Sequence, residues 1–152
     1  IPGFQRWLGQ ELDDHPDRFE TGEVPPALTE LTNQATWVGV LKQASQSLTW
    51  AKKSDDAATA LQPALTRACA RYLLEAKRGA RALDPVANFH LTNGARVERL
   101  NWLGDTSEQG MKQSAGLMVN YEYDLDDVEE NHESYSGEGK IAAATVVARL
   151  LK

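Results

Sequence analysis

The residues best suited to chemistry are one histidine and two tyrosines further along the chain. His90 lies between Phe89 and Leu91, whereas the other two histidines have polar or proline neighbours. Because an imidazole titrates near neutrality, His90 is a candidate acid or base for proton transfer. Tyr121 and Tyr123 carry hydroxyl groups that can donate hydrogen bonds from rigid rings. A second interpretation stays open, in which the histidine bonds a backbone carbonyl in the core and both tyrosines only pack.

Other common catalytic arrangements are absent from the sequence. No serine occupies a nucleophile elbow, no Cys-x-x-Cys pair occurs, and no glycine-rich phosphate loop follows a predicted strand. The acidic run at 125–135 contains His132 and several carboxylates, but no pair has the spacing of a known metal site. A solvated helix face is the simpler interpretation, so we expect no metal. Cys69 lies in an apolar stripe and is predicted to be a small buried residue.

Four cations form the only basic cluster of the sequence: Arg71, Lys77, Arg78 and Arg81. The favoured interpretation is that they lie at the C-terminal end of a helix, where the helix dipole stabilises positive charge. The alternative is a rim that binds the phosphate groups of a ligand.

Composition restricts the class of protein further. The chain has 152 residues, 41% of them hydrophobic, which is enough for one domain with a core. A net charge of −6 argues against broad binding to nucleic acid or to anionic membranes. No apolar run approaches the roughly 18 residues that span a bilayer. A single cysteine forms no internal disulfide, which suits a reducing compartment such as the cytosol.

The histidine lies in a segment, 84–105, that predicts a short helix, a glycine turn and a strand. Asp84 is placed to cap the helix, and Pro85 suits its first position. Asn93 and Gly94 then form a helix stop, with Gly94 free to adopt positive φ. The apolar residues that follow predict a strand: Val97, Leu100 and Trp102. The rival interpretation makes Asn93-Gly94 a hairpin turn between two strands.

The remaining elements are predicted from apolar residues at helical spacing and from turn residues. We expect helices over 4–12, over 25–43 as one helix or two, from 54 to 78 with an interruption at Pro63, over 107–121 and over 141–151. Connections are expected at 13–25 and 136–139, and Gly79 is expected to end the long helix. These elements predict an α+β fold that is mostly helical, with one or a few strands.

Several phrases of the sequence resemble the malonyl-CoA decarboxylase family. They are DPVANFHLTNGARVERLNW and SAGLMVNYEYDL, preceded in the same order by IPGFQRWL and LQPALTRACARYLLEAKRG. The resemblance runs from Ile1 to about Tyr123 and continues more loosely to the end. It implies that residues 1–152 are the C-terminal portion of a catalytic domain with the GNAT-type acetyltransferase fold. It also implies that an N-terminal helical domain and the first part of the catalytic domain are absent from this chain.

The family resemblance implies decarboxylation of malonyl-CoA to acetyl-CoA and carbon dioxide, a reaction of fatty acid metabolism. The histidine of the family's NFH motif maps to His90, and the second tyrosine of its NYxY motif maps to Tyr123. The family's serine belongs to the segment before Ile-Pro-Gly-Phe, so we expect the isolated chain to be inactive and to need the upstream part of the enzyme. The four-cation cluster is then a candidate contact for the phosphates of CoA.

Decarboxylation leaves the enolate of a thioester, so the thioester itself is the electron sink and we expect no cofactor. Hydrogen-bond donors hold the oxyanion, and a Ser–His pair would manage the proton that the enolate carbon receives. The end of the chain, ARLLK, lacks a Ser-Lys-Leu peroxisomal signal, which favours a cytoplasmic enzyme of bacterial type. The resemblance suggests a homo-oligomer. Two alternatives are a non-catalytic acyl-CoA-binding regulatory module and an acyl-CoA acyltransferase.

Overall fold

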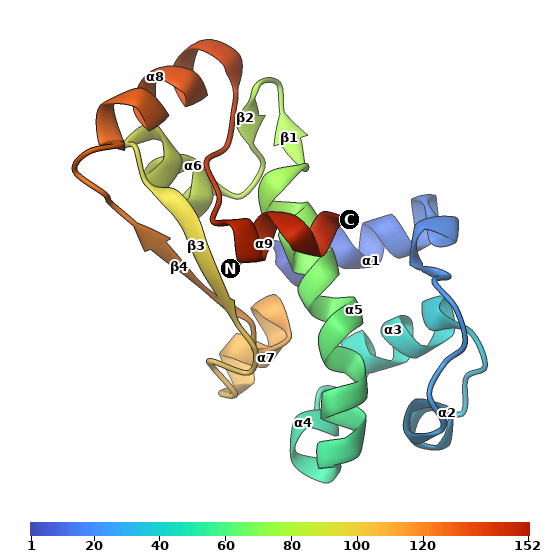
Figure 1. Cartoon of the computed structure of the whole chain (residues 1–152). Coiled ribbons are helices and arrows are strands. Elements are labelled where there is room, and N and C mark those ends of the chain that lie inside the picture. Colours follow the sequence, from blue (N-terminus) through green and yellow to red (C-terminus); the bar gives the residue numbers. More distant parts are fainter.

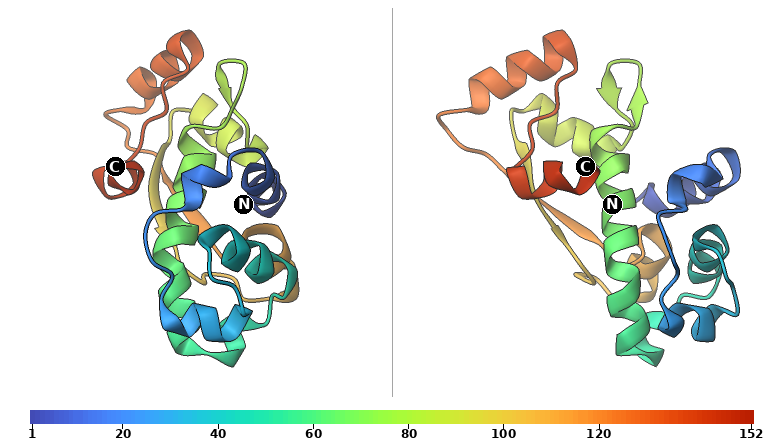
Figure 2. Two further views of the ribbon diagram at one scale, coloured as in Figure 1. Left: turned by 90° about the vertical axis from the view of Figure 1, so that its right-hand side faces the viewer. Right: turned by 45° about the vertical axis from the view of Figure 1, so that its right-hand side comes forward.

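The computed structural model describes residues 1–152 and has the α+β fold that the sequence predicts. Figure 1 shows the long helix α5 (Asp55–Leu74) between a group of helices and a two-stranded ribbon. The helical side consists of α1 (Phe4–Asp14), the 3-10 helix η1 (Pro16–Phe19), α2 (Pro26–Thr32), α3 (Trp37–Gln46) and α4 (Trp50–Lys53). The right-hand view of Figure 2 shows the same separation of helices and ribbon by α5.

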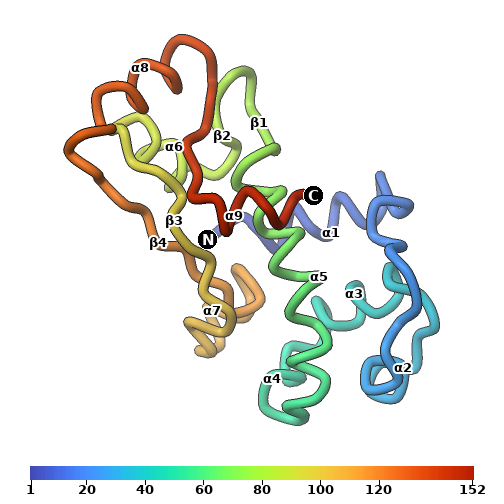
Figure 3. Tube along the Cα trace, viewed as in Figure 1, coloured from blue at the N-terminus to red at the C-terminus, as the bar shows by residue number.

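The remaining elements follow α5 in the chain and include α6, which carries His90. They are a small hairpin of β1 (Lys77–Arg78) and β2 (Arg81–Ala82), α6 (Pro85–Thr92), β3 (Arg96–Asn101), α7 (Glu108–Ser114), β4 (Met118–Glu122), α8 (Val128–Glu138), α9 (Thr145–Ala148) and the 3-10 helix η2 (Arg149–Leu151). β3 pairs with β4 in antiparallel fashion to form the ribbon. The trace in Figure 3 begins at α1 and ends at η2, and both of these elements contact α5.

The hydrophobic core lies along α5. Its apolar stripe is buried against α1 and its neighbours, and the fully buried side chains include Leu61, Leu65, Cys69, Leu73, Phe4 and Leu8. Ser54 caps α5 by accepting a hydrogen bond from the N–H of Ala57, as its sequence predicts. The sequence predicts either a kink at Pro63 or a new helix after Gln62, and the new helix is wrong, because α5 continues through the proline. Packing of the turns on both sides of the proline outweighs the one backbone hydrogen bond that it removes.

The predicted helix, turn and strand at 84–105 are confirmed. Asp84 caps α6 by accepting a hydrogen bond from the N–H of Ala87 at 2.9 Å, and Pro85 is its first residue. Gly94 follows the helix with φ of 89°, and β3 begins at Arg96. The rival hairpin turn at Asn93-Gly94 is therefore wrong.

Two predicted helix ends are wrong. The long helix ends at Leu74 rather than at Gly79, which instead occupies the turn of the β1–β2 hairpin with φ of 65°. The helix predicted over 107–121 ends at Ser114, because Ala115 adopts positive φ, and residues 118–122 form β4. The apolar residues of this segment fit either period, so pairing with β3 decides the outcome.

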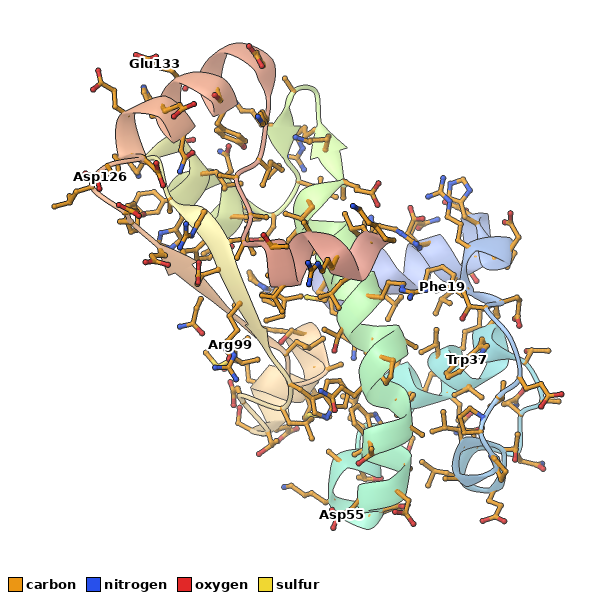
Figure 4. All side chains as sticks on the ribbon, viewed as in Figure 1. Phe19, Trp37, Asp55, Arg99, Asp126 and Glu133 are labelled. Carbon is orange, nitrogen blue, oxygen red and sulfur yellow. The ribbon has the colours of Figure 1, made fainter.

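The C-terminal segment also differs from the prediction. α8 extends through Glu138 and ends at Gly139, so the flexible turn predicted at 136–139 is mostly helix. Residues 141–144 are extended, and Val97 bonds both Ala142 and Ala144, which leaves only α9 and η2 of the predicted terminal helix. The acidic run is solvated, as predicted, and most of it forms α8: Glu133 is exposed on that helix, Asp126 is exposed in the turn before it, and both lie at the outer edge of the molecule (Figure 4). None of the helices has the length and apolar character needed to cross a membrane.

Candidate active site

The structure brings together the histidine and the tyrosine that the sequence singles out. His90 lies in the last turn of α6, and Tyr123 directly follows β4. The Nδ1 atom of His90 and the hydroxyl of Tyr123 are 2.6 Å apart, a short hydrogen bond whose donor depends on the tautomer. The Nε2 atom of the same ring makes no hydrogen bond within the chain. His90 therefore has one nitrogen anchored and the other available to a reacting group.

Aromatic rings surround the imidazole of His90. The ring of Tyr121 is stacked on it, with centroids 4.3 Å apart and an interplanar angle of 20°. Phe89 and Tyr123 approach edge-on, with centroids at 5.2 and 5.9 Å. These contacts identify His90 as part of an aromatic cluster, so the interpretation as a core histidine bonded to a backbone carbonyl is wrong.

The pleat of β4 explains why both tyrosines reach the same histidine. Alternate residues of a strand point to the same face, and this alternation continues to the residue after β4, so that the rings of Tyr121 and Tyr123 both reach His90. Tyr121 pairs with Val97 of β3, which is fully buried, and this pairing fixes its position. On the helix that the sequence predicted here, residues two apart would point to nearly opposite sides. The strand, which only tertiary pairing creates, therefore builds the site.

A buried polar contact anchors the beginning of α6. Asp84 is 1% exposed, and besides capping the helix it accepts a hydrogen bond at 3.2 Å from the hydroxyl of Tyr72 on α5. Burial, followed by the charge of Asp84, raises the pKa of Tyr72 far above its usual range. Tyr72 therefore stays a neutral donor, and the contact fixes the helix that carries His90 to the core of the protein.

The helix α8 holds the rest of α6 in place. The hydroxyl of Tyr135 accepts a hydrogen bond from the N–H of Ala82 and donates one at 2.6 Å to the side-chain carbonyl of Asn88. At the other end of α6, Nδ1 of His132 lies 2.5 Å from the carbonyl of Thr92. Sequence reasoning missed these supporting residues and Tyr72, because all of their partners come from distant segments. The only signal was an acid at a helix start, which indicated the cap and not the tyrosine.

The hydroxyl of Tyr121 is buried and has no hydrogen-bond partner in the chain. Burial raises its pKa far above the usual tyrosine range, and the charge of Asp84 adds to that effect. The group is therefore a protonated phenol at neutral pH.

The four predicted cations are divided between two consecutive elements. Lys77, Arg78 and Arg81 are exposed on the β1–β2 hairpin, and the ammonium of Lys77 donates at 2.6 Å to the carbonyl of Gly139. Arg71 lies on α5 and forms a salt bridge with Glu75. Lys77, Arg78 and Arg81 lie on one hairpin, and they are the part of the predicted set that we consider for phosphate binding.

Metal and thiol chemistry find no support in the geometry. No three side chains of the histidine, cysteine and carboxylate types lie close enough together to hold a metal ion. Cys69 is fully buried, as predicted, and burial raises the pKa of its thiol far above the usual range. It is therefore a poor nucleophile.

Comparison with known proteins confirms the resemblance over the whole chain. Residues 1–152 match the family described as the malonyl-CoA decarboxylase C-terminal domain. Mitochondrial malonyl-CoA decarboxylase of Anser anser anser is 40% identical, and the match covers 97% of this chain and 30% of that protein. The Rattus norvegicus protein is also 40% identical over 99% of this chain and 31% of its own length. The chain therefore spans about a third of the curated relatives that it matches.

Solved structures give the same result. Malonyl-CoA decarboxylase from Rhodopseudomonas palustris is 43% identical with a TM-score of 0.76, and the match covers 99% of this chain and 31% of that one. The structure from Agrobacterium vitis is 37% identical with a TM-score of 0.77, and all of this chain aligns to 34% of it.

One sequence-based expectation fails in this comparison. The curated relatives are named as mitochondrial, which contradicts the predicted cytoplasmic location. The missing peroxisomal signal could not separate cytosol from mitochondria, because it tests for only one other compartment.

The match over every residue, the shared fold and the aromatic site around His90 agree with one another. The chain belongs to the malonyl-CoA decarboxylase family and corresponds to its C-terminal domain.

Proposed function

We propose that this chain supplies the proton-transfer part of an active site that decarboxylates malonyl-CoA to acetyl-CoA and carbon dioxide. The single observation that carries the proposal is the pair formed by His90 and Tyr123, with Nδ1 bonded at 2.6 Å and Nε2 left without a partner. Membership of a family named for this reaction supports it. The chain spans about a third of its relatives, and we propose that residues outside these 152 complete the site.

The reaction requires the protein to stabilise an oxyanion and to supply a proton. When the bond between C2 and the carboxylate breaks, its electron pair moves onto the thioester carbonyl oxygen and carbon dioxide leaves. Hydrogen-bond donors must stabilise the resulting oxyanion, each typically worth about 3–4 kcal/mol. The enolate then takes a proton at C2, its carbonyl re-forms and acetyl-CoA results. The thioester is its own electron sink, so we propose that no metal or organic cofactor takes part.

We assign the proton to His90. Tyr123 holds Nδ1, and Nε2 has no partner. We propose that Nε2 passes a proton to C2, either directly or through the hydroxyl of a serine outside this chain. Tyr123 would fix the tautomer of the imidazole and orient the pair, because the hydrogen bond at one ring nitrogen decides the state of the other. General acid–base help of this kind contributes typically about 10²–10⁴-fold.

The hairpin cations are our proposed contact for the phosphates of CoA. Arg78 and Arg81 pair across the hairpin, and both are exposed. The hairpin also leads directly into α6, which carries His90. The GNAT-type architecture of the complete domain and its assembly as a homo-oligomer stay predictions.

The test is the release of acetyl-CoA from malonyl-CoA by the longer polypeptide that includes the serine segment. We expect His90→Ala to lower kcat by about 10²–10⁴-fold. His15→Ala is the matched control, because His15 is exposed and its side chain makes no contact that this site uses. Turnover within a few-fold of wild type in His90→Ala would refute the assignment. The 152-residue chain alone should be inactive; unaided turnover would show that no outside serine is needed.

A further inference from the structure

We propose that Tyr121 is a positioning residue for His90, whose ring face fixes the plane of the imidazole and thereby the direction of Nε2. This inference rests on the proposed function and extends it to a residue whose role neither the sequence motif nor the family description assigns. It is carried by the stacking geometry, by the fixed position of Tyr121 and by the burial of its hydroxyl.

The hydrogen bond to Tyr123 does not fix His90 by itself. It holds one atom, Nδ1, and the last torsion of a histidine side chain has broad minima, so the ring can still tilt about that point. Tyr123 is also 43% exposed and lies beyond the last residue of β4, where strand pairing no longer holds the backbone. A second restraint is therefore needed to define where Nε2 points.

Tyr121 supplies a restraint of the required kind. Its ring lies nearly parallel to the imidazole, with centroids 4.3 Å apart, and it is the nearest of the three aromatic neighbours of His90. A stacked face opposes tilting of the imidazole, which is the motion that the Tyr123 bond permits. The backbone of Tyr121 is fixed by its pairing with the buried Val97. The restraint therefore comes from a residue of the paired ribbon, next to the register irregularity between Val97 and Arg99.

The hydroxyl of Tyr121 does not contribute to positioning the imidazole of His90. It is buried, makes no hydrogen bond in the chain and offers no surface to a ligand. A side chain that contacts a substrate through its hydroxyl must expose that group, and Tyr123 is 43% exposed as a residue. Leaving a buried hydroxyl unpaired is unfavourable, so replacing Tyr121 with Phe removes a destabilising group and keeps the ring.

Two substitutions separate the ring from the hydroxyl, and one variant controls for packing. Tyr121→Phe retains the stacked face, whereas Tyr121→Leu fills much of the space without an aromatic ring. Val119→Ala is the matched control, because Val119 lies on the same face of β4, is half-buried and cannot stack on His90. All three are compared with wild type for folding by thermal unfolding before any other measurement.

The first readout is the proton NMR spectrum of the His90 ring in the 152-residue chain. Stacking on Tyr121 should shift the ring protons upfield, so Tyr121→Leu should lose this shift, while Tyr121→Phe and Val119→Ala should keep it. The second readout is turnover in the longer, active polypeptide. There Tyr121→Leu should lower kcat by about 10–100-fold with KM for malonyl-CoA unchanged, since misplacing a reacting group by about 1 Å has effects of this size. Tyr121→Phe should restore kcat.

The outcomes distinguish this inference from the function on which it rests. If His90→Ala loses turnover but Tyr121→Leu does not, the positioning role is overturned while the proposed function stands. If Tyr121→Phe loses as much kcat as Tyr121→Leu, the hydroxyl is the active part and the inference is wrong. If His90→Ala keeps turnover, the proposed function fails, and the kinetic part of this inference fails with it.

Discussion

The buried contact between Asp84 and Tyr72 gives a sharp quantitative prediction about how His90 is held. In Asp84→Ala, helix α6 loses its N-cap, which is worth about 0.5–2 kcal/mol. The hydroxyl of Tyr72 also becomes a buried donor without a partner, an effect of about 1–3 kcal/mol. We therefore expect the free energy of unfolding to fall by about 1.5–5 kcal/mol. For a chain of this size that lowers Tm by about 2–4 °C for each kcal/mol.

A double-mutant cycle measured by urea unfolding separates the two contributions. Tyr72→Phe should lower the free energy of unfolding by about 1 kcal/mol, because it removes a single hydrogen bond from the pair. Asp84→Ala combined with Tyr72→Phe should be less destabilising than the sum of the single variants by about 0.5–3 kcal/mol, since the hydroxyl that Asp84→Ala leaves unpaired is then gone. Asp84→Asn is the control, because asparagine can still cap the helix.

Two results would refute this reasoning. One is a loss of less than about 1 kcal/mol in Asp84→Ala, which would mean that neither the cap nor the buried hydroxyl depends on Asp84. The other is additivity of the two substitutions within about 0.3–0.5 kcal/mol, which would mean that the two side chains do not interact in solution.

The remaining predictions concern the turn after α6 and the response to acid. Gly94→Ala should destabilise the fold by at least about 1–2 kcal/mol in urea unfolding, because φ of 89° disfavours a side chain and the new Cβ would overlap the carbonyl of Val128; a change below about 0.5 kcal/mol would contradict this. The hydrogen bond from Arg96 lowers the pKa of Glu98, and hydrogen bonds from Ser107 lower that of Asp105. The folded state therefore binds fewer protons than the unfolded state, so these groups stabilise the fold above their unfolded values of about 4 and lose that contribution as the pH falls. Glu98→Gln combined with Asp105→Asn should flatten the acid limb of a stability-against-pH curve, and an unchanged limb would show that these groups do not contribute.

Local signals were sufficient wherever one short segment specified the outcome. Asp84, Pro85 and Gly94 predicted the bounds of α6, and the structure confirms them, because capping and positive φ depend only on neighbouring residues. Ser54 predicted the start of α5 for the same reason. The sequence motifs also singled out His90 and Tyr123 as candidate site residues, and the structure brings them together.

Local signals predicted the wrong secondary structure where contacts with a distant segment determine it. Residues 118–122 read as helix by themselves, and only pairing with β3 makes them a strand. Pro63 was predicted to kink the helix or to begin a new one. The helix α5 is continuous through it, because both ends of α5 are packed in the core.

The sequence by itself therefore determined the family and the local frame of helix, turn and strand around His90, and it singled out His90 as the candidate acid or base. Only the tertiary structure decided that Tyr121 and Tyr123 face the same histidine. It also decided that Tyr72 and Tyr135 support its helix, because their partners lie far away in the chain. The physical reason is that capping and turn preferences act over a few residues, whereas strand pairing and burial depend on which distant surfaces meet.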